Sequence, residues 1–477
     1  MTTEFKLPRS TPEEQGLSSK VVEEWLRALD QLRFPNSYML LRNGFVIAEG
    51  WWAPHAPEVR HQLYSLSKSF VSVAIGMAVD EGRLKLDDPV VRFFPDKLSP
   101  DMQDPFKRMT VRHLLTMSTG HETCAMGELQ KAPDGDYVRA FFSTRLAYEP
   151  GSKFVYNSSA TYILSAIISA LAGENLVEYL NPRLLLPLGV ENARWDSCPK
   201  GISLGGWGFH LATEEIARFA QMLLNKGNWN GRQLISAEYL EKAVSWQIDN
   251  SMNENPDWKL GYGFQFWRSQ HNAFRGDGAF GQYAVVIPDL NMVLAATSGM
   301  GNMQSVLTLV WDMLLPAAGK KALPENPAAL DGLRRFSSSL HIPLAVPGDG
   351  VAPMTGSVTF DIEENAVGVK RIGFDFSENV CAVTLETSAG QETIRAGFGK
   401  NVFCEETFYY KTPHKMAASA AWKDKSRLEI VCCYFETPFI VEFHCRFEGP
   451  SLTFESSSNL QFGTTDWIPL RGVKTLR

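Results

Sequence analysis

The chain has 477 residues, more than one compact core usually organises, so we expect two or three domains. Hydrophobic residues make up 44% and charged residues 21% of the sequence, a composition that is typical of globular proteins and excludes a disordered or fibrous chain. The net charge of −7 argues against a nucleic-acid partner, because binding to phosphate backbones depends on clustered lysine and arginine.

The chain starts with MTTEFKLPRSTPEEQG, which contains no apolar run of the kind found in a signal peptide. The longest apolar runs, such as VSVAIGMAV, are too short to cross a bilayer. We therefore expect a cytoplasmic protein without a membrane partner. The seven cysteines are an odd set without the paired spacing of a disulfide framework or a zinc site, which favours reduced thiols. Cys432 and Cys433 are adjacent in a predicted strand and should point to opposite faces as buried residues.

In chain order, residues 38–52 predict a β-hairpin about the turn Arg42-Asn43-Gly44, since Asn and Gly tolerate a positive φ. A helix is predicted over 65–81, with Gly82 as its stop. Its apolar positions repeat at helical spacing: Phe70, Val73, Ala74, Met77 and Ala78.

Helices and strands then alternate in a way that predicts one α+β unit with a mostly antiparallel sheet. In the helix over 213–227, Thr213 can serve as the N-cap, and Glu214 and Glu215 suit the positive end of the helix. The other predicted helices cover 111–118, 159–173 and 304–315, and the predicted strands cover 262–269, 282–289 and 291–299.

The composition changes after the Pro- and Ala-rich stretch PAAGKKALPENPAAL. We predict a first domain over 1–317, a linker over 318–354 and a second domain over 355–477. Short alternating strands in the second domain predict an antiparallel β-barrel or sandwich. These strands cover 357–363, 371–377, 382–388, 426–436, 439–449 and 452–457.

The stretch HQLYSLSKSF, residues 61–70, places Lys68 three residues after Ser65. On a helix this spacing puts both side chains on one face, so the amine can reach the hydroxyl. A serine needs a base to take its proton, and a lysine can be that base only where desolvation or nearby cations lower its pKa. A solvated Ser and Lys on a helix surface would give the same pattern. The small residues Ala74, Gly76 and Ala78 favour a central helix, and hence a nucleophile.

Several stretches together resemble the serine β-lactamase-like hydrolases: class C β-lactamases, D-alanyl-D-alanine peptidases and related esterases and amidases. The resemblance covers residues 10–317 and implies a catalytic domain with an antiparallel sheet flanked by helices. The stretches that carry it are YSLSKSF, LKLDDPVVRFFP, MTVRHLLTMSTG, YEPGSKFVYNSSATYILSAII, GGWGFHLATEEIARFAQMLLNKG and GQYAVVIPDLNMVLAATSG.

The resemblance implies that Ser65 is the acylated nucleophile, with Lys68 and Tyr156 as proton-transfer residues. Which of the two removes the first proton stays open. An ammonium beside the phenol would lower the pKa of Tyr156 from about 10. Where the family has Tyr-x-Asn, this chain has Tyr156-Asn157-Ser158, so the hydroxyl of Ser158 replaces the amide that usually contacts the substrate.

The third motif of the family corresponds to Gly276-Asp277-Gly278, where the basic residue is missing. An aspartate there would repel a substrate carboxylate unless Arg275 compensates, which disfavours β-lactam hydrolysis. Gly278 allows a close approach to the substrate, so we expect the N–H of Ala279, with that of Ser65, to form the oxyanion hole. A plain hairpin turn at RGDG is the alternative.

No other constellation indicates a cofactor. His61, His113 and His121 lack partners at metal-ligand spacing, so we expect structural or surface histidines. Trp207 and Phe209 can line the pocket or pack in the core.

The sequence thus predicts a metal-free serine hydrolase that acts on a small-molecule ester or amide. A D-amino-acid peptidase of the penicillin-binding type is one alternative, and a ligand-binding or sensor protein of the same fold without turnover is another. A homo-oligomer also stays open.

Overall fold

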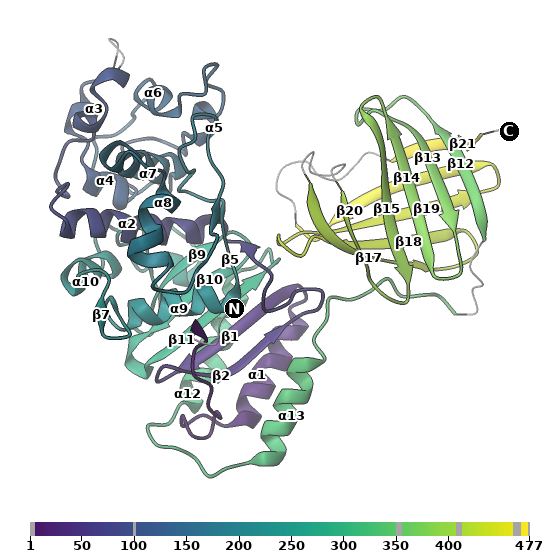
Figure 1. Ribbon diagram of the computed structural model, residues 1–477, viewed down its shortest axis with the longest axis horizontal. Coiled ribbons are helices and arrows are strands. Elements are labelled where there is room, and N and C mark those ends of the chain that lie inside the picture. The colour runs from purple at the N-terminus through teal and green to yellow at the C-terminus, as the bar shows by residue number, and fades with distance from the viewer. Residues whose placement is uncertain (1–4, 99–101, 350–354, 407–412, 461–468, 476–477) are drawn as a thin grey trace.

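The computed structural model describes residues 5–98, 102–349, 355–406, 413–460 and 469–475. Two units lie beside one another (Figure 1): the first combines helices with an antiparallel sheet, and the second is a β-barrel. The predicted α+β fold is confirmed, and the second unit is a barrel rather than a sandwich.

The sheet of the first unit has six strands in the order β2-β1-β11-β10-β9-β8. The predicted hairpin is confirmed, since Asn43 and Gly44 join its strands with φ of 52° and 83°. The strand predicted over 262–269 is wrong for most of its length, because only its end pairs with β9. The strands are β1 (Pro35–Arg42), β2 (Phe45–Trp51), β8 (Trp267–Arg268), β9 (Phe274–Gly278), β10 (Gln282–Ile287) and β11 (Met292–Ser298).

Both faces of this sheet are covered, because an apolar core lies on each side of it. Successive side chains of a strand point to opposite faces. On β1, Tyr38 and Leu40 pack on one face against α1 (Ser19–Gln31), while Met39 and Leu41 belong to the core on the other face. This explains why β1, β10 and β11 contain continuous apolar runs instead of an alternating pattern.

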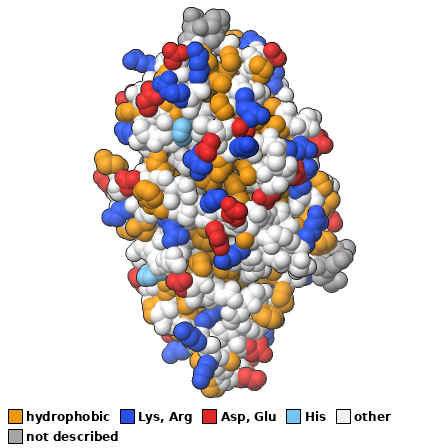
Figure 2. Space-filling view, turned by 90° about the vertical axis from the view of Figure 1, so that its left-hand side faces the viewer, with side chains coloured by type: hydrophobic (Ala, Val, Ile, Leu, Met, Phe, Trp, Pro, Cys, Tyr) orange, Lys and Arg blue, Asp and Glu red, His pale blue; other side chains and the backbone are white. Residues whose placement is uncertain are grey.

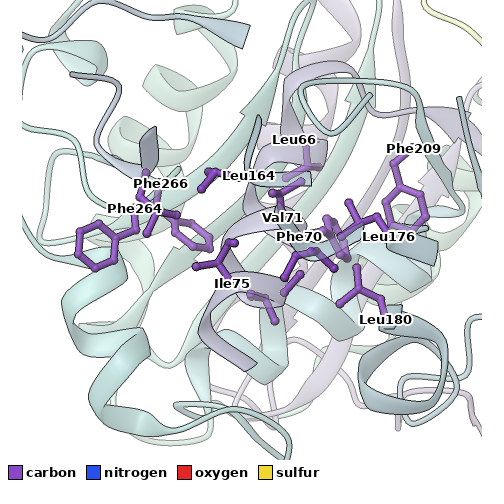
Figure 3. Close-up of a cluster of buried hydrophobic side chains, with 14 of the residues drawn as sticks. Leu66, Phe70, Val71, Ile75, Leu164, Leu176, Leu180, Phe209, Phe264 and Phe266 are labelled. Atoms are coloured by element: carbon purple, nitrogen blue, oxygen red, sulfur yellow. The ribbon is translucent and has the colours of Figure 1, made fainter. Parts of the chain in front are cut away.

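Helix α2 (Ser67–Asp80) runs through the middle of the larger core and is buried from Ser67 to Ala78. In Figure 3 apolar side chains surround it on several sides, with Phe264 and Phe266 on one side and Phe209 on the other. The central position expected from the small residues is therefore confirmed. The other helices on this side of the sheet include α4 (Val111–Leu115), α7 (Ser158–Ala172), α8 (Leu176–Leu180), α9 (Thr213–Leu224) and α10 (Ala237–Val244).

Helix α9 begins one residue earlier than its predicted cap implies. Ala212 is the N-cap residue, and its N–H donates to the Glu215 carboxylate at 2.8 Å. Thr213 lies inside the first turn, and its hydroxyl donates to Ser37 on β1 at 2.7 Å. The prediction that Thr213 caps the helix was wrong because the hydroxyl binds the sheet instead.

Among the described residues of the second unit, nine strands form a closed barrel, since β15 pairs with β17 and closes the ring. Cys432 points into the barrel core and Cys433 points outward against the first unit, which confirms their opposite orientation. The strands are β12 (Gly356–Ile362), β13 (Val369–Phe376), β14 (Val380–Thr387), β15 (Gly390–Phe398), β16 (Val402–Glu406), β17 (His414–Trp422), β18 (Arg427–Cys433), β19 (Ile440–Glu448), β20 (Ser451–Ser458) and β21 (Leu470–Lys474), of which β16 lies outside the closed ring.

The segment between the two units contains helix α13 (Pro327–Ser338), which packs against α1 and β2. An apolar cluster then joins the units, since Ala417, Val431 and Ile440 of the barrel share it with Trp52 and Met300 of the first unit. The barrel is therefore attached by packing as well as by the chain.

The surface carries charges of both signs. On the face shown in Figure 2, acidic and basic side chains are interspersed around small apolar patches. In the described part of the chain, no single helix has the length and apolar composition to cross a membrane. One pair of helices, 158–172 and 176–185, together has that length and composition, but the two helices are bent by 71° relative to one another.

Candidate active site

Ser65 and Lys68 lie at the N-terminal end of α2. Ser65 belongs to a short 3₁₀ turn, Tyr64–Leu66, that leads directly into the helix, and Lys68 lies in the first turn of α2. Lys68 Nζ is 2.9 Å from Ser65 Oγ. The spacing in the sequence therefore places the amine within hydrogen-bond distance of the hydroxyl, as predicted.

Three oxygen atoms surround the Lys68 amine, which is 1% exposed. Besides Ser65 Oγ, Nζ lies 3.1 Å from Ser158 Oγ and 2.7 Å from the carbonyl oxygen of Gly206. Burial lowers the pKa of Lys68 to about 7. A neutral amine can donate to Gly206 and Ser158 while its lone pair accepts the proton of Ser65. The environment thus suits a base that faces the serine.

Tyr156 lies beside the same pair. Its hydroxyl hydrogen-bonds with Ser65, and Lys68 Nζ is 5.0 Å from the centre of its ring. Burial, with a smaller contribution from the negative charge of Asp277, raises the pKa of Tyr156 well above its usual value. The expected lowering of this pKa was wrong, because desolvation of the phenolate dominates. The phenol therefore keeps its proton at neutral pH.

The two residues after Tyr156 form hydrogen bonds with different groups. Asn157 is fully buried and caps α7, because its Oδ1 accepts from the N–H of Ser159 at 3.0 Å. Ser158 is partly exposed, and its hydroxyl accepts from Lys68. Ser158, predicted to contact the substrate, thus also belongs to the hydrogen-bond network of the lysine.

Strand β9 approaches the turn that carries Ser65. A Cβ atom on Gly278 would lie 2.0 Å from the carbonyl oxygen of Leu63, so only glycine fits there. Gly276, Asp277 and Gly278 all belong to β9, and the turn begins only at Ala279. The alternative that RGDG is itself the hairpin turn was therefore wrong. Among the described residues the N–H of Ala279 has no acceptor, as an oxyanion donor requires.

Asp277 is held by a buried ion pair. Its Oδ2 accepts from Arg275 Nε at 2.9 Å, and the indole of Trp267 also donates to its carboxylate. Arg275 is fully buried and further donates to the carbonyl oxygen of Asp257 at 2.8 Å. Burial raises the pKa of Asp277, and the charge of Arg275 opposes that effect. Arg275 thus offsets the negative charge of Asp277. The hydrogen bonds of Arg275 keep its guanidinium inside the protein.

Sequence reasoning missed three groups at this site. The Gly206 carbonyl oxygen accepts a hydrogen bond from Lys68. In the sequence, only the glycine-rich run SLGGWGF could have indicated this contact. Trp267 stacks on Tyr156, with ring centres 5.4 Å apart and an angle of 24° between the rings. The sulfur of Cys124, an exposed cysteine, accepts from the N–H of Ser158 at 3.3 Å. These contacts join segments that are far apart in the sequence.

Other predicted candidates lie elsewhere. Phe209 is fully buried and stacks on Trp195, so it belongs to the core, whereas Trp207 is only partly buried. His121 lies between the hydroxyls of Thr119 and Thr144, each 2.8 Å away. These hydrogen bonds give His121 a structural role.

A known family of proteins matches most of the first unit. The Beta-lactamase family model matches residues 25–309. A 6-aminohexanoate-dimer hydrolase of Paenarthrobacter ureafaciens is 25% identical over 238 residues, which cover 46% of this chain and 59% of the relative. The chain therefore matches less than two thirds of that relative's length.

Two solved structures share the fold. The hydrolase EstCE1, described as having promiscuous acyltransferase activity, has a TM-score of 0.52 at 20% identity, covering 62% of this chain and 99% of its own. An octameric penicillin-binding protein homologue from Pyrococcus abyssi has a TM-score of 0.51 at 17% identity, covering 95% of this chain and 99% of its own. The fold and the matched family model together show that the chain belongs to the Beta-lactamase family, whose members include serine hydrolases.

Proposed function

We propose that the protein is a serine hydrolase that cleaves an ester or amide bond through an acyl-enzyme on Ser65. The observation that carries this proposal is the contact of 2.9 Å between Ser65 Oγ and Lys68 Nζ, an amine whose burial lowers its pKa to about 7. A relative named for hydrolysing a 6-aminohexanoate dimer and a neighbour described as an acyltransferring hydrolase support acyl transfer.

In the first step, the neutral Lys68 amine takes the proton of Ser65 while Oγ forms a bond with the substrate carbonyl carbon. The electron pair of the carbonyl moves to its oxygen, which accepts hydrogen bonds from the N–H groups of Ser65 and Ala279. The resulting lysine ammonium stays bound to Gly206 O and Ser158 Oγ.

In the second step, the carbon–nitrogen or carbon–oxygen bond to the leaving group breaks and the acyl-enzyme forms. The hydroxyl of Tyr156, which stays protonated because its pKa is raised, passes a proton to the leaving atom. The ammonium of Lys68 then returns its proton to the Tyr156 oxygen, which restores the phenol and the neutral amine. Water attacks the acyl carbon while the neutral Lys68 takes up its proton. The bond from the carbon to Ser65 Oγ then breaks, Lys68 passes that proton to Oγ, and the acid product leaves.

The charges near the site favour substrates that lack a carboxylate next to the reacting carbonyl. Asp277 is close enough to influence the pKa values of both Lys68 and Tyr156. Arg275, its partner, is fully buried and cannot bind a substrate anion without losing these contacts. Neutral esters and small amides therefore suit the site better than β-lactams or peptides with a terminal carboxylate.

Intact-mass spectrometry tests the nucleophile. A fluorophosphonate probe should add one equivalent to the wild type and to Ser152→Ala, an exposed control serine, but none to Ser65→Ala. The wild type and Ser152→Ala should also release p-nitrophenol from a short-chain ester, and Ser65→Ala should not. Labelling of Ser65→Ala at the wild-type rate would contradict the proposal, and labelling of Ser65 without any turnover would favour a sensor.

The dependence of kcat/KM on pH tests the role of Lys68. Because the neutral amine is the base, kcat/KM should rise with pH through about 7 and then stay level, since the phenol of Tyr156 stays protonated. Asp277 raises the pKa of Lys68, so Asp277→Asn should move this rise to lower pH. Asp289→Asn, a change on an exposed turn, should leave the pH of this rise unchanged. A rise that moves to higher pH in Asp277→Asn would contradict the assignment.

A further inference from the structure

One turn of the barrel contacts the two segments that carry the expected oxyanion donors. This turn, residues 434–439, joins β18 to β19. The N–H of Gln62 donates to the carbonyl oxygen of Glu436 at 2.9 Å, and the ring of Phe439 lies 5.7 Å from that of Phe280. In Figure 1 the barrel lies next to the part of the first unit that contains β5 (Phe209–Leu211), β9 and β10. The turn thus reaches the active-site side of the sheet.

The fit between this turn and the first unit is close. Asn459 Nδ2 donates to the carbonyl oxygens of Gly299 and Pro438, at 3.0 Å each. A Cβ atom on Gly299 would lie 2.2 Å from the oxygen of Pro438, so the two backbones touch. Gly299 directly follows β11, the strand next to β10. The turn is therefore attached at two places, before Ser65 and beside the β9–β10 turn.

A series of aromatic contacts connects this turn with the residues next to the expected donors. Phe280 packs edge to face on Tyr64, with ring centres 5.4 Å apart and an angle of 85°. Tyr64 directly precedes Ser65, and Phe280 directly follows Ala279. Phe439, Phe280 and Tyr64, which we call the ring chain, thus connect the barrel with the residues next to both donors.

The backbone at two members of the ring chain, Tyr64 and Phe280, needs support from surrounding contacts. Tyr64 has a φ of 48° and Phe280 a φ of 71°, in the left-handed region that bulky residues rarely adopt. Such conformations persist where the surrounding contacts stabilise them. The Ser65 N–H belongs to the peptide group that follows Tyr64, and Ala279 is joined directly to Phe280, so relaxation of either residue would shift the backbone that carries the donors.

We infer that the barrel positions the oxyanion hole, with Phe439 acting as a positioning residue through Phe280 and Tyr64. This inference rests on the proposed function. It assigns the second unit a part in the reaction: without the ring of Phe439, the turns at Tyr64 and Phe280 relax and the two N–H groups lose their common direction.

The experiment compares Phe439→Ala with Phe439→Tyr, which keeps the ring, and with Phe374→Ala. Phe374 is buried in the barrel core on β13 and is not part of the ring chain, so its replacement controls for a weaker barrel. We expect kcat to fall about 10- to 100-fold in Phe439→Ala with little change in KM, less than the loss of a whole oxyanion donor. Phe439→Tyr should keep most of the wild-type kcat, and Phe374→Ala should not lower kcat in this way.

Hydrogen exchange measured by mass spectrometry separates this inference from the proposed function. In Phe439→Ala, the amides of residues 62–66 and 279–282 should exchange faster than in the wild type and in Phe374→Ala. Unchanged exchange there would overturn the inference, whatever the activity. Faster exchange with wild-type kcat would overturn it as well. If the wild type neither reacts with the probe nor turns over an ester, the proposed function fails, and exchange still decides whether the ring chain supports the two turns.

Discussion

Replacing Lys68 by methionine is expected to lower kcat/KM by about 10³-fold, within the range for loss of a general base. Methionine fills much of the same volume but cannot accept the proton of Ser65. It also leaves the carbonyl oxygen of Gly206 and the hydroxyl of Ser158 without their shared donor. Labelling by a fluorophosphonate should slow in parallel, because activation of Ser65 is needed for both reactions.

The matched control is Lys131→Met, which changes an exposed lysine on the same unit. It should keep the activity and melting temperature of the wild type. Activity of Lys68→Met within about tenfold of the wild type would show that another group removes the proton. Tyr156 would then be the candidate, since its hydroxyl also hydrogen-bonds with Ser65.

Replacing Gly278 by alanine is expected to lower kcat by about 10²-fold or more, the size of effect seen when an oxyanion donor is removed. The added methyl group would lie 2.0 Å from the carbonyl oxygen of Leu63 and 3.1 Å from the nitrogen of Leu66. Both atoms belong to the backbone, so β9 or the turn that carries Ser65 must move. The N–H of Ala279 then loses its place opposite that of Ser65.

Steady-state kinetics and thermal melting check this expectation. Gly301→Ala is the control, because a Cβ atom there would meet nothing within 4 Å. Gly278→Ala should melt at a lower temperature than the control while remaining folded at the assay temperature. A folded Gly278→Ala with wild-type kcat would show that the close approach of β9 to Ser65 has no part in the reaction.

Local patterns in the sequence predicted the first unit well. Continuous apolar runs marked the buried strands β1, β10 and β11, and helical spacing marked α2. The Asn43-Gly44 turn was predicted because both residues tolerate a positive φ. The strand over 262–269 was wrong for most of its length because Tyr262 forms only isolated bridges, with Ile248 and Trp267, while Phe264 and Phe266 are buried by packing. A short apolar run does not distinguish such a segment from a strand.

The second unit was predicted less completely. The sequence indicated an antiparallel β domain, but β15, β16, β17 and β21 were missed. Strand β17 contains four alanines and β16 ends in two glutamates, and both residue types are depleted in strands. Closure of the barrel depends on the pairing of β15 with β17, a long-range contact that no local pattern encodes.

By itself, the sequence determined that Ser65 and Lys68 lie on one face of a helix start, because a fixed spacing on a helix has a fixed geometry. It also determined that Gly278 permits a close backbone approach, because glycine has no Cβ. Only the tertiary structure decided what surrounds the amine of Lys68, since Gly206 and Ser158 come from distant segments. Burial among those segments, rather than any local motif, sets the pKa of Lys68 near neutrality and holds that of Tyr156 high. Desolvation depends on the whole fold, and so does the contact that brings the barrel beside Tyr64 and Phe280, next to the proposed oxyanion donors.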